Sequence, residues 1–344
     1  MSRLLVLGCM LGALIAWAQP ASAAHVQCGD VIIQDTTLDS DLLDCPGDGV
    51  VIGASNVTLD LRGHTIDGTS ASGSAGVNNR AGHDGVTVTH GTVTGFFAAV
   101  RFVEADAGVI SGLEVLGSVL WLGGGSDGNR VDANRVLGQI LIDGDSSENE
   151  IARNHVTRGA GVLLVFGLRN RIEENVVTES GTGIVALGAN DTTIARNTVT
   201  RNVGAGISNR SNHTLIEGNH VTRNGFGSAF EDPSSGILSF NSLDVTMRGN
   251  HVSQNGLDGI SIAQSQRGVT IVEGNMTLRN ADDGIDLDQA TLAPPQLHSA
   301  TVARNKAHHN GDLGIEAVPQ VTDGGRNKAH GNGNPLQCLN VRCK

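Results

Sequence analysis

Seven carboxylates are concentrated in three short segments toward the C-terminal end of the chain. They are Asp258, Asp282, Asp283, Asp286, Asp288, Asp312 and Glu316. In an extended strand, Asp286 and Asp288 share one face with their Cα atoms about 7 Å apart, and Glu316 comes to about 5 Å from Asp286 if their segments are neighbouring strands. Carboxyl pairs about 5–5.5 Å apart suit retaining hydrolysis of glycosidic bonds, and pairs about 6.5–9.5 Å apart suit inverting hydrolysis. Asp286, Asp288 and Glu316 are therefore the candidate catalytic acid and base.

The same carboxylates have two other interpretations. Clustered Asp and Glu oxygens are ligands for hard cations, so the first is a Ca²⁺ site formed by Asp283, Asp286, Asp288 and Asp312. An aspartate before a glycine is also common in turns, so the second is a set of solvated acidic turns. The sequence leaves hydrolysis, Ca²⁺ binding and a purely structural role open.

Few basic or aromatic residues are available to bind a substrate. The chain contains no Tyr, which excludes any mechanism that needs a tyrosine acid or base. Trp121 is the candidate for stacking on a sugar ring. The other candidate substrate-binding residues are Arg210, Phe240, Arg267 and His298. Elimination chemistry would require one of these two arginines near the bond that breaks.

Composition limits the class of fold and partner. The 344 residues include 47 Gly and 7 Pro, and 39% of them are hydrophobic. This content is enough for a core, and the scarcity of helix-forming residues favours short strands joined by tight turns. The formal net charge of −12 disfavours nucleic-acid binding, because phosphate contacts need a basic surface.

A repeat runs through most of the chain. One position recurs as Gly or Asn twelve times between residues 63 and 327, with a mean spacing of 24 residues. Its members are Gly63, Gly91, Gly112, Asn134, Asn154, Asn175, Asn197, Asn219, Asn250, Asn275, Asn305 and Asn327. Gly and Asn accept a left-handed backbone most readily, so we expect a turn with positive φ at this position. Stacked asparagines are also expected to bond to one another through their amides.

A second mark, a glycine followed by an aliphatic residue, begins a short alternating strand in each repeat. Gly161-Val162, Gly183-Ile184 and Gly206-Ile207 are examples. Strands and tight turns with a period of 20–30 residues are typical of a solenoid. The sequence therefore predicts one all-β domain, a parallel β-helix of about twelve coils over residues 49–330.

These repeats resemble those of the right-handed parallel β-helix superfamily with the pectate-lyase-like fold. They are also similar to carbohydrate-binding and sugar-hydrolysis repeats of periplasmic proteins, and residues 49–68 resemble the first coil of many such proteins. The resemblance covers about residues 45–335 and implies a right-handed coil and polysaccharide chemistry. The Gly-His-Gly and Arg-Ile-Lys marks of polygalacturonase-like hydrolases are missing from this sequence.

The N-terminal segment predicts export. Residues 1–23 combine Arg3, a short apolar run and a small-residue cleavage site ending at Ala23, which is typical of a signal peptide. No other apolar stretch approaches the length of a membrane span. Four cysteines remain and allow three pairings; we favour the local ones, Cys28–Cys45 in an N-terminal cap (24–48) and Cys338–Cys343 in a C-terminal cap (331–344). The protein is expected to be secreted or periplasmic.

Most histidines follow the repeat. His155, His220 and His251 each come directly after the recurring asparagine, and we expect them to be structural. His308 and His309 lie near the acidic segments and are candidates for a base or a metal ligand.

Strand alternation assigns the residue after each inward aliphatic to the outer surface. The outward column is largely apolar from Trp121 to Leu187 and becomes acidic from Asp258 onward. Insertions near residues 225–235 and 289–299 would form walls beside the acidic part. We expect the protein to bind or cleave polysaccharide in a groove over its C-terminal coils. The alternative is a non-catalytic structural or surface protein that self-associates through the apolar stripe.

Overall fold

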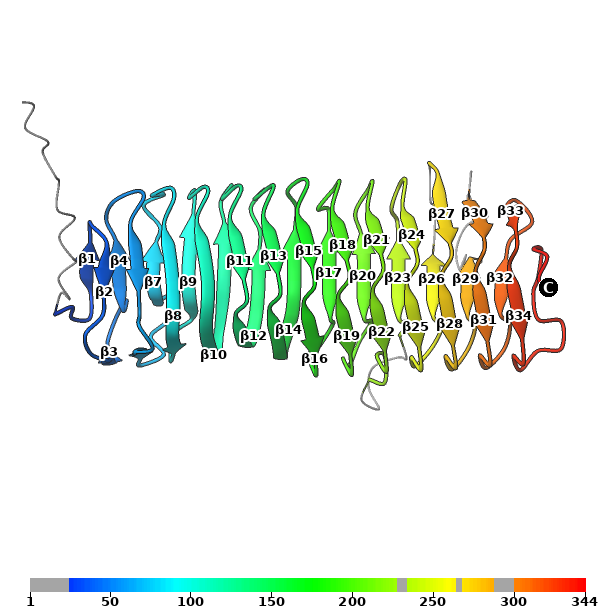
Figure 1. Ribbon diagram of the computed structural model, residues 1–344, viewed down its shortest axis with the longest axis horizontal. Helices are drawn as coiled ribbons and strands as arrows, with labels where there is room; N and C mark the ends of the chain where they lie inside the picture. The colour runs from blue at the N-terminus through cyan, green and yellow to red at the C-terminus, as the bar shows by residue number, and fades with distance from the viewer. Residues whose placement is uncertain (1–24, 228–233, 264–267, 288–299) are drawn as a thin grey trace, which may run out of the picture.

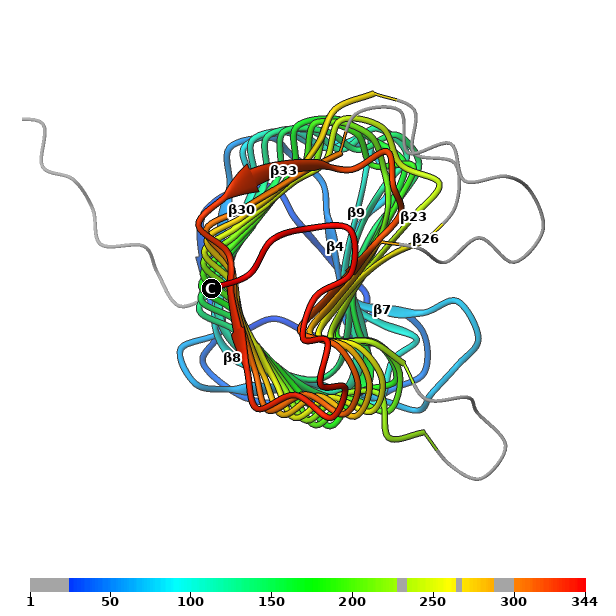
Figure 2. The same ribbon diagram turned by 90° about the vertical axis from the view of Figure 1, so that its right-hand side faces the viewer.

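The computed structural model describes residues 25–227, 234–263, 268–287 and 300–344, and in these residues the chain forms a long solenoid of β-strands (Figure 1). Each turn of the solenoid contributes one strand to each of three columns, and every strand pairs in parallel with its equivalents in the turns before and after it. Viewed along the axis, the three columns lie on three sides of a common interior (Figure 2). The all-β parallel β-helix predicted from the repeat is confirmed, with about thirteen turns.

The first column carries the predicted glycine–aliphatic strands. It consists of β1 (Asp30–Ile32), β4 (Val50–Ile52), β7 (Ala75–Asn79), β9 (Ala98–Val103), the final parts of β10 (Val109–Gly123), β12 (Arg135–Ile142) and β14 (His155–Val165), β17 (Ile184–Leu187), β20 (Ile207–Arg210), β23 (Ile237–Phe240), β26 (Ile260–Ala263), β29 (Ile285–Leu287) and β32 (Ile315–Ala317). The aliphatic residues that begin these strands, such as Ile184 and Ile207, are register partners and fully buried.

The second column follows the first across a turn. It consists of β2 (Thr36–Thr37), β5 (Thr58–Asp60), the beginnings of β8 (Thr87–Thr94) and β10, β11 (Arg130–Asp132), β13 (Glu150–Ala152), β15 (Arg171–Glu173), β18 (Thr193–Ala195), β21 (Leu215–Glu217), β24 (Thr246–Arg248), β27 (Thr270–Glu273), β30 (Ala300–Ala303) and β33 (Thr322–Gly325).

The third column completes each turn. It consists of β3 (Leu42–Cys45), β6 (Thr65–Gly68), the end of β8, the middle of β10, the beginnings of β12 and β14, β16 (Val176–Thr178), β19 (Thr198–Thr200), β22 (His220–Thr222), β25 (His251–Ser253), β28 (Met276–Leu278), β31 (Lys306–His308) and β34 (Lys328–His330).

A ladder of buried asparagines fills the turn between the second and third columns. In Asn197, the backbone N–H and Nδ2 both donate to Oδ1 of Asn219, at 2.9 and 3.0 Å. Nδ2 also donates to the carbonyl of Ile172 at 2.8 Å, and Oδ1 accepts two bonds from Asn175. The ladder continues with the same geometry from Asn134 to Asn327. The predicted amide ladder is therefore confirmed.

The prediction of a left-handed backbone at the ladder position is wrong, because the left-handed residue lies one position earlier in the chain. The positive φ belongs to the residue before each ladder asparagine, for example Arg196 at 54° and Gly218 at 62°. This preceding residue makes the turn and points outward, whereas the asparagine points inward to bond the next turn. Gly63 and Gly112 do have positive φ, but Gly112 occupies the preceding position, because Leu113 is the residue that donates its N–H to Oδ1 of Asn134.

Two further asparagine ladders lie in the other turns. One occupies the turn between the third and first columns and comprises Asn202, Asn224, Asn255, Asn280, Asn310 and Asn332. The other, between the first and second columns, comprises Asn129, Asn149 and Asn170. All of these asparagines are buried, so each turn is tied to the next at its corners as well as through its strands.

The outward column of the first strand follows the expected order. Its members are register partners in the sequence Arg101, Trp121, Leu141, Leu163, Val185, Ser208, Leu238, Ser261, Asp286 and Glu316. Leu141, Leu163 and Val185 are half-buried. Arg101 is buried, and its Nη2 donates to the carbonyl of Gly73 at 2.8 Å.

The structure contains disulfides at both ends of the rod, Cys28–Cys45 and Cys338–Cys343, with Cα–Cα distances of 5.4 and 6.2 Å. The segment assigned to the N-terminal cap includes β1, β2 and β3, which together form the first turn of the solenoid. The expected signal segment, residues 1–23, lies outside the described residues. The described residues include no helix that could cross a membrane.

We expect Asn197→Ala to destabilise the protein by about 3 kcal/mol, because it leaves several buried N–H and C=O groups without partners. The measurement is the free energy of unfolding from chemical denaturation. Thr198→Ala, which changes a half-buried side chain on the neighbouring strand β19, is the control and should cost less than about 1 kcal/mol. Equal losses in the two variants would contradict a stabilising role for the ladder.

Candidate functional site

A cluster of carboxylates lies where the third-to-first turns meet the strands of the first column, in the C-terminal turns. Asp258 precedes β26, Asp282 and Asp283 precede β29, Asp286 lies within β29, and Glu316 lies within β32. Asp286 and Glu316 are register partners on adjacent strands. The repeat therefore stacks acidic side chains from three consecutive turns at the spacing of hydrogen-bonded strands.

The cluster contains two overlapping groups of three carboxylates. In Asp283, Asp286 and Glu316, one oxygen from each side chain lies within 4.8 Å of the other two, and the same holds for Asp258, Asp282 and Asp283. Asp258, Asp283 and Asp286 are only 1–4% exposed, whereas Asp282 and Glu316 are half-buried. Asp283 belongs to both groups and is the centre of the cluster.

Glycine at position 284 allows the turns to approach closely beside the cluster. A Cβ on Gly284 would lie 2.5 Å from the carbonyl oxygen of Gly314 and 2.7 Å from Nδ2 of Asn310. Any larger residue would displace the backbone that carries Asp283 and Asp286. The glycine before each aliphatic strand is thus required by packing against the next turn.

Burial changes the protonation of the two innermost carboxyls. Desolvation raises the pKa of Asp283 to about 8, and a side-chain hydrogen bond with Glu316 adds to the rise. Desolvation also raises the pKa of Asp258 to about 6, against the opposing hydrogen bond from the backbone N–H of Asp283. Asp283 accepts a 2.6 Å hydrogen bond from the N–H of Leu313. Burial therefore favours the protonated form of Asp283 at neutral pH.

The structure brings together only part of the predicted site. Asp283, Asp286 and Glu316 meet as expected, but Asp312 belongs to neither group and donates its backbone N–H to the carbonyl of Asp282. Asp258, expected only as one of the clustered carboxylates, completes the second group with Asp282 and Asp283. Asp288, Arg267 and His298 lie outside the described residues.

The predicted substrate-binding residues lie elsewhere on the same face. Trp121 is seven strands from Asp286 along the column, roughly 34 Å. Its Nε1 donates to Asp143 at 2.8 Å, and Arg101 stacks 5.2 Å from its ring centre. Arg210 stacks 5.3 Å from the ring centre of Phe240, which lies two strands from Asp286. The tryptophan therefore belongs to a separate aromatic and arginine group nearer the N-terminus.

Comparison with known proteins agrees with the solenoid architecture. The model for the right handed beta helix region matches residues 117–275 and 227–340. The chain belongs to this β-helix family. No curated protein sequence matches it.

Solved structures resemble this β-helix over most of its length. The A-module of mannuronan C-5 epimerase AlgE6 from Azotobacter vinelandii is 14% identical with a TM-score of 0.50, and the alignment covers 89% of this chain and 90% of that one. A double mutant of the tailspike protein of E. coli bacteriophage HK620, in complex with a pentasaccharide, is 13% identical with a TM-score of 0.55 and coverages of 91% and 73%. At this identity the similarity establishes the fold alone.

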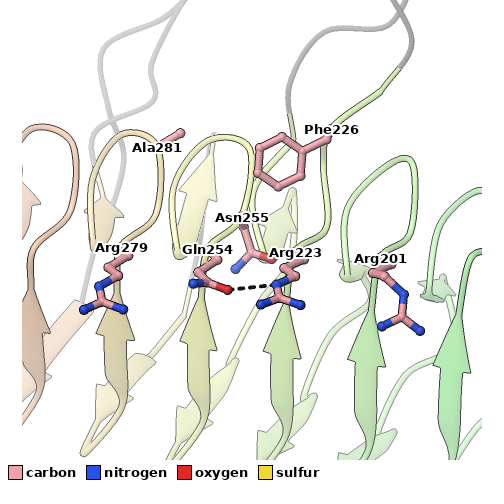
Figure 3. A pocket seen from close by; sticks show the side chains of 7 residues that line it. All are labelled: Arg201, Arg223, Phe226, Gln254, Asn255, Arg279 and Ala281. Atoms are coloured by element: carbon pink, nitrogen blue, oxygen red, sulfur yellow. Dashed lines mark hydrogen bonds between the residues drawn. The ribbon is translucent and has the colours of Figure 1, made fainter.

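A pocket of about 610 Å³ lined by arginines lies on the same third-to-first turns of the β-helix. The sequence alone did not indicate it. Figure 3 shows Arg201, Arg223 and Arg279 in a row, with Gln254 between the last two and Phe226 on the opposite wall. The three arginines and Gln254 directly follow strands of the third column. They belong to recurring Thr-Arg-Asn and related segments, which in the sequence look like part of the structural repeat. The pocket also includes Ala281, next in sequence to Asp282, and thus adjoins the carboxylate cluster.

Two of these three arginines differ from those in the turns between the second and third columns. There, arginines pair with acids; Nη2 of Arg248, for example, lies 2.6 Å from Glu217. In the pocket, Nη2 of Arg201 lies 3.7 Å from Glu179. Nε of Arg223 donates to the amide oxygen of Gln254 at 2.9 Å, and neither Arg223 nor Arg279 forms an ion pair with any described residue. The pocket is therefore a basic site on an acidic protein.

We expect the stability of the protein to fall as the pH rises from about 4 to about 8. Asp258 and Asp283 retain protons in the folded state up to about pH 6 and 8, whereas in the unfolded chain they ionise near pH 4. The folded state binds more protons in this window, so the free energy of unfolding decreases with pH. Denaturation midpoints measured at intervals across this range provide the test.

Asp283→Asn should remove most of this pH dependence and raise the stability at pH 8, since the amide needs no proton. Asp312→Asn, on the neighbouring turn but outside both groups, is the matched control and should keep the wild-type slope. Identical slopes in the wild type and Asp283→Asn would show that Asp283 ionises normally in the folded protein.

Proposed function

We propose that the protein binds an acidic polysaccharide across its C-terminal turns and hydrolyses it at the carboxylate cluster. The observation that carries this proposal is the cluster in which oxygens of Asp283, Asp286 and Glu316 lie within 4.8 Å of one another, and burial of Asp283, which raises its pKa to about 8, supports it. Hydrolysis of a glycosidic bond requires a carboxylic acid and a carboxylate side by side. The cluster supplies both at neutral pH.

Exposure assigns the roles within the cluster. Glu316, the most accessible member of its group, donates the proton that it shares with Asp283 to the oxygen of the leaving sugar. The carboxylate of Asp286 stabilises the positive charge that develops at the anomeric carbon as the bond to the leaving oxygen breaks. Water then adds to that carbon and gives one proton to Glu316, which restores the acid.

The arginine pocket supports an acidic rather than a neutral substrate. Successive turns of a parallel solenoid are about 4.8 Å apart, so Arg201, Arg223 and Arg279 form a row along the rod. Guanidinium groups bind carboxylate and sulfate groups in forked geometry, and Phe226, which is 62% exposed, offers an apolar face to a sugar ring. A chain lying along this row would pass the carboxylate cluster on the same turns.

The similar solved structures are consistent with a polysaccharide ligand, because one is a mannuronan epimerase and the other is bound to a pentasaccharide. The two disulfides support an oxidising compartment. We therefore place the proposed activity in the periplasm or outside the cell.

Glu316→Gln should lower the rate of product release by at least about 100-fold, as expected for loss of a general acid, with an unchanged denaturation midpoint. The assay measures reducing ends and ultraviolet absorbance on a panel of neutral and acidic polysaccharides. Asp312→Asn is the control and should remain active. New absorbance along with reducing ends would indicate elimination, and folded wild-type protein that releases no product would favour the non-catalytic surface protein.

Arg223→Ala and Arg279→Ala should each weaken the binding of an acidic polysaccharide by about tenfold and leave the binding of a neutral one unchanged, because each removes a charge-assisted contact. Affinity electrophoresis at two salt concentrations measures the effect, which should shrink at high salt. Arg248→Ala removes an arginine that is already ion-paired and serves as the control. Equal weakening by all three variants would rule out a specific pocket.

Ca²⁺ binding by Asp283, Asp286 and Glu316 is a second candidate function. Three oxygens within 4.8 Å of one another can face a single cation, and Ca²⁺ prefers such carboxylates. The cluster needs either a proton or a cation to offset its charge. Calorimetric titration with Ca²⁺ separates the two, because saturable binding by the wild type that is lost in Asp286→Asn would favour the ion, and absence of binding would favour the proton.

A further inference from the structure

The last five strands of the third column form a surface without acidic residues. β22, β25, β28, β31 and β34 pair one after another along the rod (Figure 1). These strands and the residue that follows each of them contain no Asp or Glu, although acidic residues outnumber Lys and Arg by 35 to 23 in the chain. We call the outer face of residues 220–223, 251–254, 276–279, 306–309 and 328–331 the basic strip.

All three lysines of the chain stand in one row at the end of this strip. The backbone N–H groups of Lys306, Lys328 and Lys344 donate to the carbonyls of ladder asparagines in the preceding turns, at 2.8, 2.8 and 3.0 Å. Lys306 and Lys328 are register partners. Lys344 continues the row by one step, because the residues before Lys328 and Lys344 also pair. All three lysines are exposed.

The positive charge of the strip is not neutralised by neighbouring acids. Four exposed cations of the strip form no ion pair with any described residue: Arg223, Arg279, Lys306 and Lys328. Earlier in the third column the arginines are compensated, since Glu179 lies 3.3 Å from Arg158 and 3.7 Å from Arg201. Unpaired positive charge therefore begins at β22 and continues to the last turn.

Stacked imidazoles occupy much of the space between these cations. The ring centres of His220 and His251 are 4.8 Å apart, and those of His308 and His330 are 3.9 Å apart. An imidazole can donate an N–H to an anion and never carries negative charge. The strip thus offers cations and N–H donors over four strand spacings, about 19 Å.

The width of the strip favours a linear partner. The two outward residues of each strand are about 7 Å apart, and acidic groups lie on both sides of the strip. Glu217 and Glu273 lie at the end of the second column, where they pair with arginines. Asp282 and Asp283 lie in the turn before β29. A flat anionic surface such as a bilayer would face these carboxylates as well, whereas a single chain along the strip would lie between them.

We propose that an acidic polysaccharide lies along the basic strip and extends from the arginine pocket to the lysine row at the end of the rod. The inference rests on the proposed function for the class of ligand, and it does not depend on hydrolysis. It adds Lys306 and Lys328 to the residues that bind the chain. An ammonium group acts as a point charge without the forked geometry of arginine, so the lysine row accepts carboxylate and sulfate groups alike.

Dextran sulfate and uncharged dextran are matched probes for this surface. In affinity electrophoresis the wild type should bind dextran sulfate and not dextran. The double variant Lys306→Gln/Lys328→Gln should bind dextran sulfate about tenfold more weakly, because two unpaired cations are lost, and the difference should shrink at high salt. Arg62→Gln/Arg80→Gln removes two exposed cations from the N-terminal turns and should bind like the wild type.

Acetylation of the lysines gives a second readout that needs no variant. Bound dextran sulfate should slow the acetylation of Lys306 and Lys328 at least about fivefold, because an ammonium group paired with an anion is less available to the reagent. Dextran should give no protection. Mass spectrometry of the digested protein measures the modification of each lysine separately.

Equal affinity of the wild type and Lys306→Gln/Lys328→Gln for dextran sulfate, or unprotected lysines, would overturn the inference. If Arg223→Ala still weakened binding in that case, the arginine pocket would stand without the strip. Lysine-dependent binding to vesicles of phosphatidylcholine and phosphatidylglycerol, with no binding to dextran sulfate, would overturn it in favour of a membrane partner. Lysine-dependent binding without product release from any polysaccharide would support the strip and contradict hydrolysis alone.

Discussion

The structure depends on keeping each turn of the chain in register with the next, and buried amides enforce this. An asparagine such as Asn197 makes hydrogen bonds to the turns on both sides, and its side chain has no access to water. A slip of one residue would leave these donors and acceptors unpaired in the interior, at a cost of about 1–3 kcal/mol for each group. Three ladders at three corners repeat this constraint along the rod, so many of the strands that they join need only three residues.

Strict register has a chemical result. Equivalent residues of successive turns lie one strand spacing apart, so similar side chains are forced into contact. Asp286 stacks beside Glu316, and His308 stacks beside His330. Groups of like charge in such columns need a proton, a cation or an anion to be stable together. At the buried carboxylates the proposed solution is a proton on Asp283, and at the arginines it is an acidic ligand.

Much of the fold could be predicted from the spacing of Asn and Gly, because these residues recur once in each turn of the solenoid. The outward column was also predictable. A glycine marks the start of each strand, and the alternation of side chains along a strand then shows which residues point outward. The position of the left-handed residue was missed because a recurring asparagine has two explanations. The position can require either its tolerance of positive φ or the hydrogen bonds of its side-chain amide, and the sequence does not distinguish them. Asp258 was recognised only as one of several clustered carboxylates, and its role and the arginine pocket were missed for a related reason. Both belong to turns, where alternation gives no direction and where a recurring Thr-Arg-Asn segment looks purely structural.

The ladders also have a direction. In each rung the earlier asparagine donates its backbone and side-chain N–H groups to the amide oxygen of the later one, as Asn197 does to Asn219. The C-terminal end of each ladder therefore presents amide donors that have no following rung to accept from them. At the end of one ladder Asn332 donates to Oε1 of Gln337, a residue outside the repeat. A single glutamine thus caps that ladder in the way that a side chain caps the end of a helix.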